Sequence, residues 1–121
     1  MGKSKTFTEL IVWQKAHALT LDVYRITQNF PKKEVYGITS QIRRASVSVA
    51  ANIAEGFKRR SPNDKARFFN ISEGTLDETK YFLILVKDLN FIKANDSLME
   101  QVDEVSKLLY SYKKAILNSN S

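Results

Sequence analysis

Apolar residues at helical spacing are the feature of this sequence that most restricts its fold. In residues 8–28 they recur at alternating steps of four and three, which places them on one face of a helix. Related patterns occupy residues 38–59, 62–89 and 97–117, so we predict four helices of about 20 to 28 residues. The first seam consists of Val12, Ala16, Leu19, Val23, Ile26 and Phe30.

Short breaks separate these four segments. Pro31 excludes helical geometry at Phe30, and Gly37 closes the connection to the second helix. Ser61 is a good N-cap and Pro62 suits the first position of a helix, so the third helix begins there. After the stretch NFIKAND, an asparagine or aspartate at 95 or 96 can cap the fourth helix.

Length and composition fit a single all-α domain. The chain has 121 residues, and two domains of half that length would each bury too small a core. Four glycines and two prolines leave little material for β-turns. We therefore predict an antiparallel up-down-up-down four-helix bundle over residues 1–121, with residues 1–7 and 118–121 flexible. No signal-peptide or membrane-spanning pattern is visible, so we expect a cytoplasmic protein that does not enter a membrane.

The second and third helices carry unusually wide apolar arcs. In residues 38–59 one face holds Ile42, Ala45 and Val49, and an adjoining face holds Ala50 and Ile53. Such arcs exceed the needs of one bundle core, and large exposed apolar patches are rare on monomers. We expect the surplus to be buried against other copies of the chain. The alternative is that both helices are packed on several sides within a monomer.

Positive charge is concentrated in the first two thirds of the chain. The net charge is +6, yet residues 68–121 carry six basic and eight acidic residues. A localised basic excess suggests a polyanionic partner, most often nucleic acid, although charge of this kind also serves solubility. The candidate nucleic-acid-binding residues are Arg43, Arg44, Lys58, Arg59, Arg60, Lys65 and Arg67.

Each part of this basic set has a structural alternative. Cations at positions 58–60 stabilise a helix C-terminus without any ligand. Arg43 or Arg44 can instead pair with Glu34 or with an acid on another helix. No sequence-reading module is visible, so binding should be backbone-led, salt-sensitive and weakly selective. Trp13, Tyr36 and Phe57 could stack on bases, but aromatic residues at helical spacing more often belong to a core.

Polar residues line one side of the second helix. Gln41, Ser48, Asn52 and Glu55 lie at offsets of seven, four and three, and Glu78 falls in a stripe of the third helix. We interpret them as a buried hydrogen-bonded seam between helices or subunits rather than a catalytic pocket. A metal site on two glutamates would require Glu-x-x-His pairs, which are absent.

No other residue offers obvious catalytic or metal-binding chemistry. The chain has no cysteine and one histidine, His17, which we expect on a helix surface or at an interface. We therefore expect no enzymatic activity, no metal and no cofactor.

The sequence resembles the four-helix-bundle proteins found in intervening sequences of bacterial large-subunit ribosomal RNA genes. It is also similar to the accessory proteins of reverse transcriptases in diversity-generating retroelements. The resemblance spans roughly Phe7 to Ile92 and rests on VWQKA, FPKKEVYGITSQIRRASVSVAANIAEG, RFFNISEGTLDE and LNFI. The signature positions are Trp13, Pro31, Glu34, Tyr36, Gly37, Gln41, Arg43, Arg44, Ser48, Asn52, Glu55 and Gly56.

This resemblance implies a homo-oligomeric ring, a pentamer before other numbers, that binds nucleic acid and has no established catalytic activity. RNA is the expected ligand ahead of DNA, and a nucleic-acid enzyme is a further candidate partner. The alternative is a structural or adaptor module whose basic surface binds an acidic protein or a reverse-transcriptase-like partner. One departure is SEGTL at residues 72–76, where many relatives carry an alanine-glycine-serine run. We expect Glu73 to face solvent or a neighbour's base.

Overall fold

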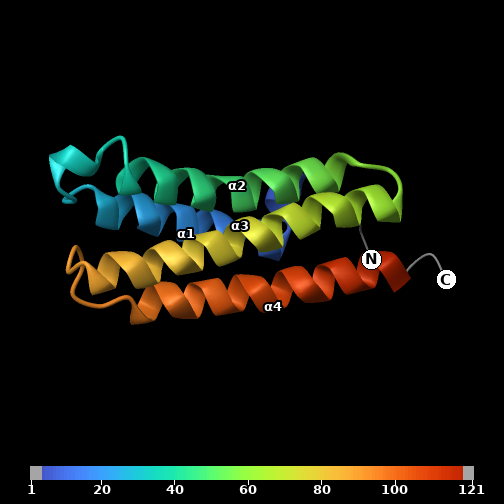
Figure 1. The fold of residues 1–121 in the computed structure, drawn as a ribbon. Helices are drawn as coiled ribbons and strands as arrows, with labels where there is room; N and C mark the ends of the chain where they lie inside the picture. The colour runs from blue at the N-terminus through green and yellow to red at the C-terminus, as the bar shows by residue number, and fades with distance from the viewer. Residues whose placement is uncertain (1–3, 119–121) are drawn as a thin grey trace.

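The computed structural model describes residues 4–118, which form four long helices and two single-turn 3-10 helices. Each long helix packs on the next, and α1 also packs on α4, so the four close into an antiparallel up-down-up-down bundle (Figure 1). The all-α four-helix fold predicted from the sequence is confirmed. In chain order the elements are η1 (Phe7–Glu9), α1 (Ile11–Thr27), η2 (Lys32–Glu34), α2 (Ile38–Lys58), α3 (Pro62–Asp88) and α4 (Asp96–Asn118).

All four long helices contribute to one apolar core. The predicted seam of α1 is buried from Val12 to Val23, and Trp13 and Phe57 pack against the edge of the core. The core interpretation is therefore right for these two aromatic residues. The largest side chains at the centre are Leu19, Ile42, Ile53, Phe69, Leu76, Leu83 and Leu109.

The wide apolar arc of α3 divides into a buried and an exposed part. Phe69, Leu76 and Leu83 are buried, while Ile71 is 44% exposed and Leu89 is 45% exposed. The core therefore uses the row of Phe69, Leu76 and Leu83, which lie seven residues apart along α3. The apolar arc is wide, so the packing of α2 and α4 decides which part of α3 becomes the core.

Local capping fixes the helix ends. The Ser61 hydroxyl accepts a hydrogen bond from the Asp64 N–H at 3.1 Å, as expected for an N-cap before Pro62. At the other end of α3, Asn90 adopts a left-handed backbone with φ 63°, which asparagine tolerates well. Sequence analysis began the first helix at residue 8, but α1 begins at Ile11 because Leu10 is extended after the η1 turn.

Small hydroxyl residues connect the helices inside the core. The Thr20 hydroxyl on α1 donates to the Ser46 carbonyl of α2 at 3.0 Å. The Ser72 hydroxyl on α3 donates to the Val49 carbonyl of α2 at 2.8 Å. These buried donors are satisfied by backbone acceptors, which allows polar side chains inside an apolar core.

The predicted flexible ends fall partly outside the described residues. Residues 1–3 and 119–121 are not described, so for them flexibility stays a prediction. Within the described part, the Thr6 N–H donates to the Glu9 carboxylate at 3.3 Å, and Asn118 is the last residue of α4. No helix in residues 4–118 is apolar over a long enough stretch to cross a membrane.

Candidate nucleic-acid interface

The junction between α2 and α3 gathers most of the predicted basic set. The turn contains only Arg59, Arg60 and Ser61, because α2 ends at Lys58 and the Ser61–Pro62 pair starts α3 at once. Two basic helix ends are therefore held close together. They border a hollow of about 500 Å³ lined by Glu55, Lys58, Arg59, Arg60, Ser61 and Asp64.

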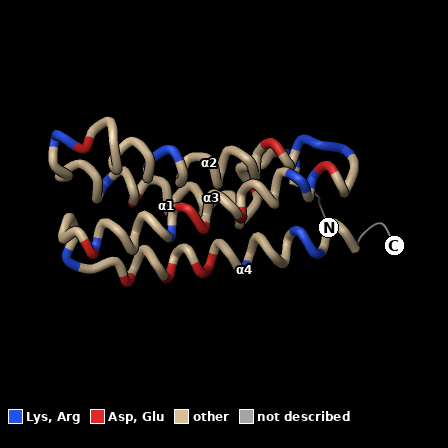
Figure 2. Tube along the Cα trace, viewed as in Figure 1, with Lys and Arg blue, Asp and Glu red and all other residues tan. Residues whose placement is uncertain are grey.

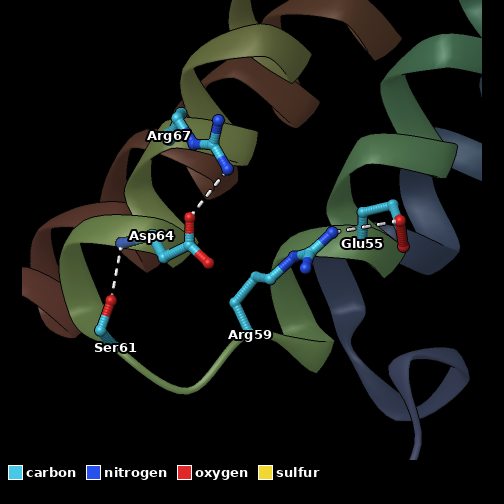
Figure 3. A network of polar contacts seen from close by, with 5 residues as sticks. All are labelled: Glu55, Arg59, Ser61, Asp64 and Arg67. Atoms are coloured by element: carbon cyan, nitrogen blue, oxygen red, sulfur yellow. Dashed lines mark hydrogen bonds and ion pairs between the residues drawn. The ribbon is translucent and has the colours of Figure 1, made fainter.

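Two arginines at this junction share one aromatic ring. The Arg59 guanidinium lies 4.5 Å from the centroid of the Phe68 ring, and the Arg67 guanidinium lies 4.9 Å from it. Each also has an acidic neighbour on its own side of the turn: Arg59 lies 3.5 Å from Glu55, and Arg67 lies 2.9 Å from Asp64 (Figure 3). These contacts restrict both side chains while leaving several N–H donors unused.

Lys65 has a structural role that sequence analysis did not foresee. Its ammonium donates to the carbonyls of Phe57 at 2.7 Å and Gly56 at 3.3 Å, in the last turn of α2. The ammonium adds a donor to the last turn of α2, where the Gly56 carbonyl also accepts from the Arg59 N–H, and it complements the helix dipole. Burial lowers the pKa of Lys65 below its ordinary value. Lys65 was predicted to bind nucleic acid, but its ammonium is already engaged within the chain.

Lys58 and Arg60 are the cations of the junction that remain free. Both side chains are exposed, and neither makes a hydrogen bond or ion pair with another described residue. No ion pair with a described residue therefore holds these two cations, unlike Arg59 and Arg67.

Further cations lie at the same end of the molecule (Figure 2). Lys5 lines a hollow together with Lys58, and Lys113 on α4 donates to Asn70 at 2.8 Å and Glu73 at 2.6 Å. Glu73 thus pairs with a base on α4 of the same chain, whereas solvent or a neighbour's base was expected. We call this end of the bundle the basic end and define it by Lys5, Lys58, Arg59, Arg60, Lys65, Arg67, Lys113 and Lys114.

Arg43 and Arg44 lie elsewhere, so the structure does not unite the seven predicted residues. Arg44 and Lys58 are fourteen residues apart on α2, about 21 Å along the helix axis. Arg43 donates to the Thr27 hydroxyl at 2.7 Å and stacks on Tyr24, not on Glu34. Arg44 is exposed and has no partner among the described residues.

The predicted polar seam is not buried within one chain, which corrects that part of the sequence interpretation. Gln41, Glu55 and Glu78 are exposed, and the Asn52 amide donates only to Ser48, four residues earlier on α2. The seam lies on the outer surface of α2 because Ile42, Val49 and Ile53 take the inner face. Its role between subunits stays a prediction. In residues 4–118 no group of three His, Cys, Asp or Glu side chains is placed to hold a metal.

Sequence analysis missed two aromatic contributors to the exposed surface. Phe68 was not singled out, yet it supports two arginines; its position directly after Arg67 was the available signal. Tyr36 was expected in the core, but it is 95% exposed. His17 is exposed as expected, and its ring stacks on Trp13 with centroids 4.9 Å apart.

Comparisons with other proteins agree with this architecture. The family model described as "23S rRNA-intervening sequence protein" matches residues 8–111. The fold is similar to a crystal structure of a protein of unknown function from the S23 ribosomal protein family of Bacteroides thetaiotaomicron, with a TM-score of 0.76 and 27% sequence identity. That similarity covers 86% of this chain and 99% of the other. Curated proteins give no match to the sequence.

Proposed function

The chain belongs to the family of 23S rRNA-intervening sequence proteins, and from this premise we propose that it binds nucleic acid without being an enzyme. RNA is the preferred ligand, ahead of DNA. Binding takes place at the basic end and is directed to the phosphate backbone. It is therefore sensitive to salt and only weakly selective for sequence.

The observation that carries this proposal is the pair of free cations, Lys58 and Arg60. Neither forms an ion pair with a described residue, and Arg59 and Arg67 stack on Phe68 beside them with N–H donors unused. A phosphate that meets several such cations releases condensed counterions, which supplies most of the affinity of non-specific binding. Arginine also offers a planar fork that fits phosphate oxygens.

We also propose that the protein is a homo-oligomer, with a pentameric ring as the leading arrangement. Exposed apolar side chains on α3 support self-association, among them Ile71 at 44% and Ile84 at 42% exposure. In a ring whose bundles are parallel, the basic ends of all subunits would share one rim. A long polyanion could then contact several basic ends at once, which raises the overall affinity.

The proposal is tested by measuring affinity for random-sequence RNA and DNA oligomers across a series of salt concentrations. The variant Lys58→Ala/Arg60→Ala should bind more weakly to every sequence, and the slope of log K against log salt should fall by about two. The matched control Lys87→Ala/Lys93→Ala removes two exposed lysines at the opposite end and should keep the wild-type slope.

Two results would contradict the proposal. One is an absence of binding near 50 mM salt by a protein that is folded. The other is an unchanged salt slope in Lys58→Ala/Arg60→Ala. Retention of an acidic protein by the same basic end, without nucleic-acid binding, would instead support an adaptor function.

A further inference from the structure

Tyr36 is the most exposed of the large apolar and aromatic side chains in the described chain, at 95% of its accessible surface. It sits in the connection between α1 and α2, at the end of the bundle opposite the α2–α3 junction (Figure 1). The connection turns tightly, because the Gly37 N–H donates to the Glu34 carbonyl at 2.9 Å. This turn directs Tyr36 away from the core, so its ring contributes no core packing.

A groove of about 410 Å³ lies beside Tyr36. Its walls include two tyrosines and two arginines, and no acidic residue lines it. Tyr24 and Arg43 form one fixed wall, because the guanidinium lies 4.5 Å from the Tyr24 ring centroid and Nε is hydrogen-bonded to Thr27. Arg44 completes the groove with an exposed guanidinium that has no partner among the described residues.

We propose that this groove binds an unpaired nucleotide, whose base stacks on Tyr36 and whose phosphate contacts Arg44. The inference rests on the proposed nucleic-acid binding and adds a second contact to it. An exposed aromatic ring beside a free cation is the arrangement by which proteins hold single strands with little sequence preference. A base inside a duplex is already stacked and cannot lie on the tyrosine without being flipped out.

The composition of the groove favours a nucleotide over a second copy of the chain. Two arginines and no acidic residue line the groove, so charge complementarity favours an anionic occupant, while the tyrosines together with Val35 and Val47 supply apolar surface for a base. A phosphate would neutralise the charge of Arg44, and a base would stack on the exposed ring of Tyr36. The groove lies about 21 Å from Lys58 along α2, so it is a separate contact from the basic end.

The test compares a single-stranded RNA oligomer with a duplex of the same length and sequence. Tyr36→Ala should lower the affinity for the single strand about ten-fold and leave the affinity for the duplex unchanged. Tyr36→Phe keeps the ring and should behave like the wild type. Arg44→Ala should also weaken single-strand binding and reduce the salt slope by about one.

Tyr81→Ala is the matched control, because Tyr81 is 56% exposed on α3 and no described arginine lies over its ring. It should bind both RNAs as the wild type does. Equal affinity of the wild type and Tyr36→Ala for the single strand overturns the inference while leaving the proposed function standing. So does a loss of oligomer mass in Tyr36→Ala, which would assign Tyr36 to a subunit contact. If the wild type binds neither RNA, the proposed function itself fails.

Discussion

At the scale of single residues, two glycines on neighbouring helices have opposite surroundings. Gly56 of α2 is buried, and a Cβ atom built there would lie 2.7 Å from Cε1 of Phe69 and 3.2 Å from Cβ of Phe68. Phe69 is completely buried, so its ring has no free space to move into. Gly74 of α3 is exposed, and a Cβ atom there would meet nothing within 4 Å. Gly56 therefore permits the close approach of α2 and α3, whereas Gly74 has no role in the packing of the helices.

Gly56→Ala should accordingly destabilise the protein by about 1–3 kcal/mol, the usual cost of forcing an extra methyl group into a packed core. Gly74→Ala should stabilise it by about 0.5–1 kcal/mol, because alanine loses less backbone entropy in a helix. Urea denaturation of both variants measures the two effects. Equal stabilities would contradict the proposed contact between Gly56 and Phe69.

At the scale of secondary-structure elements, the Lys65 side chain links α2 and α3 at their junction. Lys65 reaches from the first turns of α3 to the last carbonyls of α2. Without it, those carbonyls would lose donors at the place where the helix dipole is negative. The cation thus stabilises the turn that holds the free cations Lys58 and Arg60 in position.

Lys65→Met should lower the free energy of unfolding by about 1 kcal/mol, whereas Lys58→Met should leave it nearly unchanged because Lys58 is exposed and unpaired. Burial lowers the pKa of Lys65 in the folded state, so the unfolded chain holds this proton more tightly. The stability advantage of the wild type over Lys65→Met should therefore increase as pH rises through the folded-state pKa toward 10.5, and decrease as pH falls through it. Denaturation curves at pH 7 and pH 10 check both statements, and a larger advantage at pH 7 would refute the second.

The helices could be predicted closely from the sequence, because seam spacing and capping residues act over a few positions. The 3-10 turn of η1 could not, since it depends on the extended backbone at Leu10. For the candidate site, the sequence identified the basic residues at 58–60. It did not reveal that Lys65 and Arg43 are engaged within the chain, because those contacts join residues that meet only after the helices pack.

At the scale of the whole molecule, the apolar surface of α3 is separate from the basic end. The outer surface of α3 exposes Ile71 and Ile84, while cations lie toward both ends of the bundle (Figure 2). Acidic residues occupy the first half of α4, where Glu104 lies 3.6 Å from Lys15 and Asp103 lies 3.9 Å from Lys80. This separation allows subunits to meet along their sides without covering the proposed nucleic-acid surface.

Ile71→Glu should therefore dissociate the proposed oligomer, because it places a charge within an apolar contact. The mass in solution should fall from that of an oligomer, about 70 kDa for a pentamer, toward the 13.9 kDa of one chain. Helix content measured by circular dichroism should not change, since Ile71 lies outside the core. Leu117→Glu, at the end of α4, is the control and should keep the wild-type mass. A wild type that is itself monomeric would refute the proposed assembly.

The cations of the basic end also outnumber the acids beside them, Glu55, Asp64 and Glu73, which makes this end of the bundle positively charged. In the field of a polyanion, such a molecule experiences a torque that turns its positive end forward before contact. The charge distribution would then govern how often a collision is productive, and not only how long a complex lasts. Stopped-flow association rates should accordingly fall with added salt more steeply than dissociation rates rise.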